Sequence, residues 1–362
     1  MAKSDISDTV FKLSEVKPLL LDCISGNVPA FLWGPPGIGK SDIIREIGRD
    51  LGGYVIDIRL AIRQPSDILG IPFFNKELNL MDWAPPIDLP TEEFAAKYPI
   101  VILFLDEMNS APPLVQAASY QLVLDRRVGK YILPDNVWIV AAGNRETDRG
   151  VTFRLPTPVA NRFAHYNVKH DAKSWIDWGA KNGIDPTILG HISYSEQYLF
   201  NFDPASGDKA FPTPRSWAFL SRLLTSKDRS EEHIRRQALA TIGEGATTSF
   251  MAHRKNGANL PKPEDVLSGK VTTLKDVDMS ARYSLVMSLC FKLKEINDQK
   301  IPKEEYNEIC DNFMGFALNC LEPELGVLAA RMAVKNFKIF FDGSKLKNFK
   351  LWTSKYIKFL MD

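Results

Sequence analysis

A glycine-rich loop that ends in a lysine and a hydroxyl is the first segment that could do chemistry. It fits the pattern G-x-x-x-x-G-K-[ST] in full, with the residues Gly34, Pro35, Pro36, Gly37, Ile38, Gly39, Lys40 and Ser41. Such glycines let backbone N–H groups turn toward phosphate, and the helix expected to follow adds its positive end. Lys40 would neutralise the outer phosphates and Ser41 would hold Mg²⁺. The loop therefore predicts binding of ATP with Mg²⁺.

Two acids follow an apolar run and supply the second half of this chemistry. Asp106 and Glu107 come directly after the run at residues 102–105. In an open parallel sheet, ligands bind at the carboxyl ends of the strands, which places both carboxylates beside the glycine-rich loop. Phosphoryl transfer depends on positioning and on charge. We therefore expect Asp106 to bind Mg²⁺ through its water shell and Glu107 to orient the attacking water.

A third apolar run, at residues 137–142, ends in the polar side chain of Asn144. Its amide is well placed to hold the attacking water or the γ-phosphate from a neighbouring strand.

The elements that must position these residues alternate between short apolar runs and helical segments up to about residue 170. This alternation favours a parallel sheet covered by helices on both faces. The expected strands are residues 30–33, 54–58, 100–105, 137–142 and 164–168, and a helix is expected at 13–24. After Lys169 the pattern is helical, with an apolar stripe at residues 283–293.

These motifs together resemble those of the AAA+ ATPases, and within them the MoxR-like proteins. The resemblance covers about residues 10–260 and rests on motif order. Besides the glycine-rich loop, the motifs that carry it are Leu105-Asp106-Glu107-Met108-Asn109 with Ala111-Pro112-Pro113, Asn144 as sensor 1, Asn161-Arg162-Phe163, and Pro212-Thr213-Pro214-Arg215-Ser216-Trp217 as sensor 2. Two residues depart from the family pattern. Relatives often have Arg or Lys at the position of Ser110, and Asp at the position of Asn161.

The resemblance implies an α/β P-loop AAA+ core with a central parallel five-stranded sheet, followed by an α-helical lid and a helical C-terminal extension. We place these parts at residues 1–170, 171–260 and 261–362. It also implies a ring, usually a hexamer, with ATP between subunits. Arg162 would be the arginine finger and Arg215 the lid residue that senses the same phosphate. The alternatives to these roles are structural. Arg162 could form a surface salt bridge, and Arg215 could be a charged residue at the start of a helix.

Two hairpins are expected to interrupt the core, at residues 73–83 and 127–132. In relatives both point toward the central pore of the ring. Phe73, Phe74, Lys130 and Tyr131 are therefore candidates for substrate contact, with packing on their own domain an equal alternative.

Composition narrows the class of protein. Lys and Arg number 45 against 44 Asp and Glu, with 45% hydrophobic residues, which is typical of a globular protein and argues against a coat of positive charge for nucleic acid. Apolar runs such as 100–105 fall far short of the roughly 20 residues that a bilayer requires. The N-terminus lacks the pattern of a secretory signal, so we expect a cytoplasmic protein. Its four scattered cysteines indicate reduced thiols and no zinc site.

The leading hypothesis is a MoxR-like ATPase ring that remodels a partner protein or complex, commonly one with a von Willebrand factor A domain. Two alternatives stay open. One is a nucleic-acid motor of the restriction-related kind, and the other is a scaffold that ATP gates by binding alone.

Overall fold

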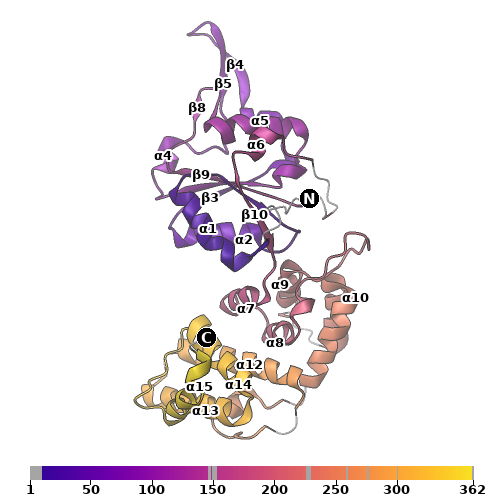
Figure 1. Ribbon diagram of the computed structural model, residues 1–362, viewed down its shortest axis with the longest axis vertical. Coiled ribbons are helices and arrows are strands. Elements are labelled where there is room, and N and C mark those ends of the chain that lie inside the picture. Colours follow the sequence, from indigo (N-terminus) through magenta and orange to yellow (C-terminus); the bar gives the residue numbers. More distant parts are fainter. Residues whose placement is uncertain are drawn as a thin grey trace, which may run out of the picture. The chain divides into compact units, whose positions relative to one another are not determined.

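The computed structural model describes residues 10–145, 148, 153–225, 230–257, 260–274, 277–299 and 301–360, with side chains up to residue 356. The chain divides into two compact units, Met1–Asp171 and Ala172–Asp362. We call them unit 1 and unit 2 and describe each by itself (Figure 1).

Unit 1 is built on a parallel sheet of six strands in the order β1-β10-β2-β9-β6-β3. All five expected strands are present. The sixth, β1, pairs with β10 and was missed because three residues are too few to show a pattern. The strands are β1 (Val10–Lys12), β2 (Ala30–Trp33), β3 (Tyr54–Arg59), β6 (Val101–Asp106), β9 (Val137–Gly143) and β10 (Ala164–Lys169).

Helices cover both faces of this sheet, with α1 and α2 on one side and α5 and α6 on the other (Figure 1). Every residue of β6 and β9 is buried, as expected for central strands that pack on two layers. Gly48 lets α2 approach β3, because a Cβ there would lie 2.5 Å from Val55 Cγ2. The helices are α1 (Leu13–Ser25), α2 (Lys40–Asp50), α3 (Pro65–Leu69), α4 (Glu92–Ala95), α5 (Pro113–Asp125) and α6 (Thr157–Ala160), with 3-10 turns at Leu60–Ile62 and Met108–Ser110.

Both expected hairpins form. Strands β4 (Ile71–Asn75) and β5 (Leu80–Ala84) pair antiparallel, with Phe74 opposite Met81, and extend away from the sheet (Figure 1). Strands β7 (Arg127–Val128) and β8 (Tyr131–Ile132) make the shorter one.

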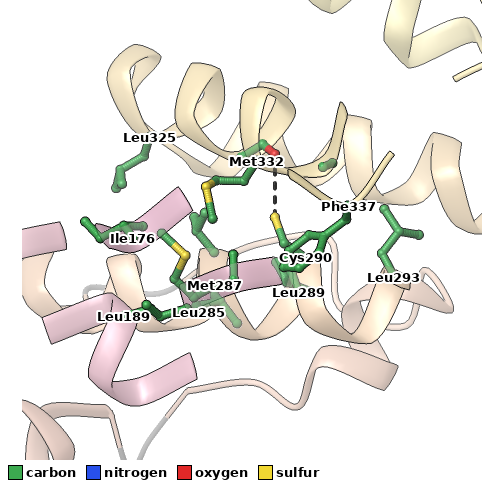
Figure 2. Close-up of a cluster of buried hydrophobic side chains, with 14 of the residues drawn as sticks. Ile176, Leu189, Leu285, Met287, Leu289, Cys290, Leu293, Leu325, Met332 and Phe337 are labelled. Carbon is green, nitrogen blue, oxygen red and sulfur yellow. Dashed lines mark hydrogen bonds between the residues drawn. The ribbon is translucent and has the colours of Figure 1, made fainter. Parts of the chain in front are cut away.

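Unit 2 is helical and has one hydrophobic core. The segments that the sequence separates at residue 260 contribute to the same core, so lid and extension pack as one body. Figure 2 shows part of it, where Cys290 donates a weak hydrogen bond to Ala329 O. The elements are α7 (Ala172–Lys181), α8 (Pro186–Tyr194), a 3-10 turn at Glu196–Tyr198, α9 (Pro214–Leu223), α10 (Glu231–Gly257), α11 (Pro263–Leu267), α12 (Met279–Asp298), α13 (Lys303–Cys320), α14 (Pro323–Arg331), a π-helical turn at Met332–Asn336 and α15 (Lys347–Leu360).

The longest helix, α10, bends at Gly243, which has φ 77° and ψ 175°. A Cβ there would lie 2.4 Å from Ala210 O, so the bend requires glycine. Within the described residues, no helix combines the length and apolar character that crossing a bilayer requires.

Candidate functional site

The glycine-rich loop joins the end of β2 to the start of α2, as the sequence predicts. Gly37 and Gly39 have φ of 77° and 102°, a backbone conformation that residues other than glycine rarely adopt. Gly34 N donates to Gly143 O at 3.2 Å, and a Cβ on Gly34 would lie 2.8 Å from Val168 O. Neighbouring strands therefore fix the start of the loop. The first amides of α2 are left without carbonyl partners of their own helix, which is the arrangement that binds phosphate.

Lys40 is the first residue of α2, and its ammonium connects the loop to the next strand. It donates to Gly34 O at 2.5 Å, to Pro35 O at 3.0 Å and to Asn144 Oδ1 at 3.3 Å. Two residues assigned separately from the sequence, one after β2 and one after β9, thus meet directly. A phosphate oxygen would be a stronger partner for this ammonium than neutral carbonyls.

Asp106 ends β6 and accepts a hydrogen bond from Ser41 Oγ at 3.3 Å. Its other oxygen accepts from Glu107 N at 2.9 Å. The residue is 8% exposed, and burial raises the pKa of its carboxyl group, with the neighbouring carboxylate of Asp57 raising it further. A hydroxyl beside a buried carboxylate is a set of hard oxygen donors that fits Mg²⁺, whose charge would offset the cost of burying the anion.

Glu107 follows in a left-handed conformation, with φ 56°. For a residue other than glycine this costs about 1 kcal/mol, and such outliers gather at functional sites. Its side chain is half-exposed, so it is accessible to water. Arg59, at the end of β3, lies with Nε 4.0 Å from Glu107 Oε1. Arg59 and Asp57 were not predicted as site residues, although both lie in a predicted strand or just after it, because nothing in their residue types marks them.

Asn144 is positioned by Asn109, the last residue of the motif Leu105-Asp106-Glu107-Met108-Asn109, for which no role was predicted. Asn109 Nδ2 donates to Asn144 O at 2.7 Å, and Asn144 N donates to Asn109 Oδ1 at 3.2 Å. Asn109 is 1% exposed. A Cβ on Gly143 would lie 2.1 Å from Asn109 Oδ1, so this pairing needs glycine at that position. The amide of Asn109 therefore fixes the end of β9 against the turn after β6.

The two arginines belong to different units and are described separately. Arg162 follows α6, is exposed, and forms no ion pair with any residue that the structure describes, so the salt-bridge alternative gains no support. Arg215 lies exposed in the first turn of α9, in unit 2. Their roles as finger and sensor stay predictions.

The hairpin residues separate into two groups. Phe74 is 60% exposed and Phe73 is also exposed. Tyr131 instead packs on its own unit, where its hydroxyl donates to Pro90 O at 2.6 Å and burial raises its pKa to about 12. Lys130 binds Asp82 of the other hairpin at 3.0 Å, so the two hairpins support each other.

Comparison with known proteins finds likeness only among solved structures. No family model matches the chain, and no curated protein matches it. A protein of Cytophaga hutchinsonii assigned as an ATPase is similar at 14% identity over 90% of this chain and 81% of its own, with a TM-score of 0.37. NtrX of Brucella abortus, in complex with ADP, is similar at 14% over 90% and 68%, with a TM-score of 0.38.

A RuvB mutant of Thermotoga maritima is similar at 14% identity over 72% of this chain and 77% of its own, with a TM-score of 0.36. These values are too low to bear on function. Fold class follows instead from the strand order and from the loop between β2 and α2. The chain has an α/β core with a glycine-rich phosphate-binding type of loop between β2 and α2, and a helical unit follows it in the sequence.

Proposed function

We propose that the protein is an ATP hydrolase of the MoxR-like kind that works as a ring and remodels a partner protein or complex. One observation carries the proposal. The contacts of Lys40 with Asn144 and of Ser41 with Asp106, each at 3.3 Å, bring groups from three neighbouring strand ends to one place. Phosphoryl transfer needs a cation, a metal-binding carboxylate and a polar amide together in this way.

Each residue then has a distinct task. The loop amides and Lys40 hold the phosphates, and Ser41 and Asp106 hold the metal ion. When bound, Mg²⁺ supplies charge that offsets the negative charge developing on the phosphate oxygens. Glu107 orients and polarises the attacking water, and Asn144 aligns it. The half-exposed position of Glu107 supports this role because its carboxylate is open to water.

Assembly and partner belong to the same proposal. Arg162 would act from a neighbouring subunit of a hexamer, and its exposure without an ion pair among the described residues is compatible with that use. The exposed apolar side chains of the β4–β5 hairpin, among them Phe74 and Met81, support contact with a protein. By resemblance, we expect that protein to carry a von Willebrand factor A domain.

Replacing Glu107 with glutamine tests the proposal. Removing the group that orients water should slow ATP hydrolysis by about 100-fold or more while ATP still binds. Glu93→Gln is the matched control, because Glu93 is an exposed glutamate on α4 of the same unit. Hydrolysis by Glu107→Gln at the parent rate would show that the assigned role is wrong.

The same variant tests the partner. Held with ATP, Glu107→Gln should form a ring by light scattering and should retain a von Willebrand factor A protein in a pull-down, whereas ADP should release it. Full activation of the partner by Glu107→Gln would instead indicate a scaffold that is gated by ATP binding alone.

A further inference from the structure

Positive charge is concentrated near the C-terminal end of the chain, although the chain as a whole is almost neutral. Residues 335–355 contain six lysines and one aspartate, a net charge of +5. Because the whole chain carries +1, the remainder carries −4. A charge asymmetry of this size indicates contact with a polyanion, and the net figure for the whole chain conceals it. We call this segment the basic segment.

All six lysines of the basic segment are exposed. Lys335 lies 3.8 Å from Asp177, near the limit for an ion pair. The other five form no ion pair within the part of the chain that the structure describes, and they are Lys338, Lys345, Lys347, Lys350 and Lys355. The single aspartate, Asp342, accepts hydrogen bonds from Ser344, which lower the pKa of its carboxyl group. The lysines are therefore exposed, and most of their positive charge has no ion-pair partner among the described residues.

The basic segment is held firmly by the core of unit 2. Trp352 and Tyr356 of α15 are buried in that core. Asn348 N donates to Asp311 Oδ1 at 2.8 Å, which ties the start of α15 to α13. At 100° per residue, Lys347 and Lys350 lie on the side of α15 opposite Tyr356. An amphipathic helix can lie in a bilayer only if its apolar face is free, and this face is already occupied.

The basic segment also contains an exposed aromatic ring. Phe340, between Lys338 and Lys345 in sequence, is 76% exposed, although apolar neighbours such as Ile339 and Phe341 are buried. Surfaces that bind single-stranded nucleic acid combine cations for the backbone with exposed rings on which bases stack. Lysine is a point charge with no planar fork, which suits phosphate contact without base recognition.

We propose that the basic segment binds single-stranded nucleic acid, with its lysines on the phosphates and Phe340 stacked on a base. Observations on unit 2 carry the inference, which does not depend on hydrolysis by unit 1. It identifies a surface through which an ATPase of neutral net charge could act on nucleic acid.

The test is a titration of a fluorescent oligothymidylate of about 20 nucleotides with the full-length protein in the absence of ATP. Binding is measured by fluorescence anisotropy at salt concentrations from about 50 to 200 mM. A triple variant, Lys338→Gln, Lys345→Gln and Lys347→Gln, should bind at least about tenfold more weakly at the lowest salt. Its slope of log affinity against log salt should be smaller by about 2, because each phosphate contact on a single strand contributes about 0.7. The matched control replaces the exposed Lys181, Lys255 and Lys303 of unit 2 with glutamine and should keep both values.

Phe340→Ala provides a second and independent measurement. Loss of one stacked base should weaken binding of the single strand about tenfold and leave binding of a duplex unchanged. Melting curves matching the parent would show that both variants fold. Equal losses in the lysine variant and its control would overturn the proposal. So would binding of phosphatidylserine vesicles or polyglutamate without binding of the oligonucleotide. Because ATP is absent, such a failure leaves the proposed hydrolase untouched.

Discussion

Two of the regions that bury polar side chains differ in their surroundings: the strand ends of unit 1 and the helical core of unit 2. At the strand ends, Asp106 and Asn109 each have hydrogen-bond partners, and the groups around them face a loop shaped for phosphate. In the core of unit 2, His191 is 1% exposed, and neither of its ring nitrogens has a partner among the described residues.

The histidine in unit 2 belongs to a pair. His253, 3% exposed, lies 5.2 Å from His191 between ring centroids, and its two nitrogens are hydrogen-bonded to the hydroxyls of Ser280 and Ser284. Burial lowers the pKa of His191 to about 3, with the neighbouring His253 adding to the effect. Burial likewise lowers the pKa of His253 to about 4, with Asp278 opposing and Arg254 adding.

The difference separates two uses of a buried polar group. At an open sheet edge, paired groups can exchange a protein partner for a ligand, and so they can do chemistry. Inside a closed core, no ligand can reach a neutral imidazole that has no hydrogen-bond partner. Protonation of that imidazole lowers the free energy of unfolding. The first region should therefore respond to nucleotide and the second to pH.

The largest effect should come from acid acting on the histidine pair. Both pKa values are lower in the folded protein than the usual 6.5, so the unfolded chain binds more protons below that pH. Stability is then full above about pH 6.5 and falls by about 1.4 kcal/mol per pH unit for each histidine as the pH drops toward 4. His191→Phe should remove one of these two contributions, making the variant about 3 kcal/mol more stable than the parent near pH 4.

Urea unfolding across this pH range, followed by circular dichroism, measures the effect. Near pH 7 the variant should match the parent, because His191 already lies against the rings of Tyr198, Trp217 and Phe250. If the free energy of unfolding changed with pH in the same way in the parent and in His191→Phe, His191 would not stay neutral in the folded protein. The contrast between the two regions would then fail.

The sequence predicts the first region far better than the second. The glycine-rich loop and Asp106 carry local patterns with a chemical reason, and the strands that hold them, β2 and β6, are continuous apolar runs up to these residues. The hydrogen-bond partners that other elements supply to these residues could not be predicted. Asn109 and Asn144 are 35 residues apart, for example, and their pairing depends on the order of the strands in the sheet. His191 and His253 lie still farther apart, with no spacing that marks them as neighbours. The basic segment was visible in the sequence but was averaged away in the net charge.

Asn109→Ala should give the next largest effect and would sharpen the contrast from the side of unit 1. It removes two partly buried hydrogen bonds and leaves Asn144 N and O without them, at a cost of about 2 kcal/mol in the free energy of unfolding. With Asn144 no longer fixed, kcat for ATP should fall about tenfold while KM changes little. A loss of stability with unchanged kcat would reduce Asn109 to a structural residue.

The smallest effect should come from Asp106→Asn, and its sign is the informative part. Burial and Asp57 raise the pKa of Asp106, so the ionised carboxylate destabilises the folded protein at neutral pH. Asparagine should therefore raise the melting temperature in EDTA on the order of 2 °C, a gain that disappears as the pH falls toward the pKa of the unfolded chain. ATP with Mg²⁺ should reverse the order, because only the parent carboxylate gains a cation. A melting temperature that falls in EDTA would mean that the hydrogen bonds from Ser41 and Glu107 outweigh the cost of burying the charge, and the site would be built for stability more than for binding.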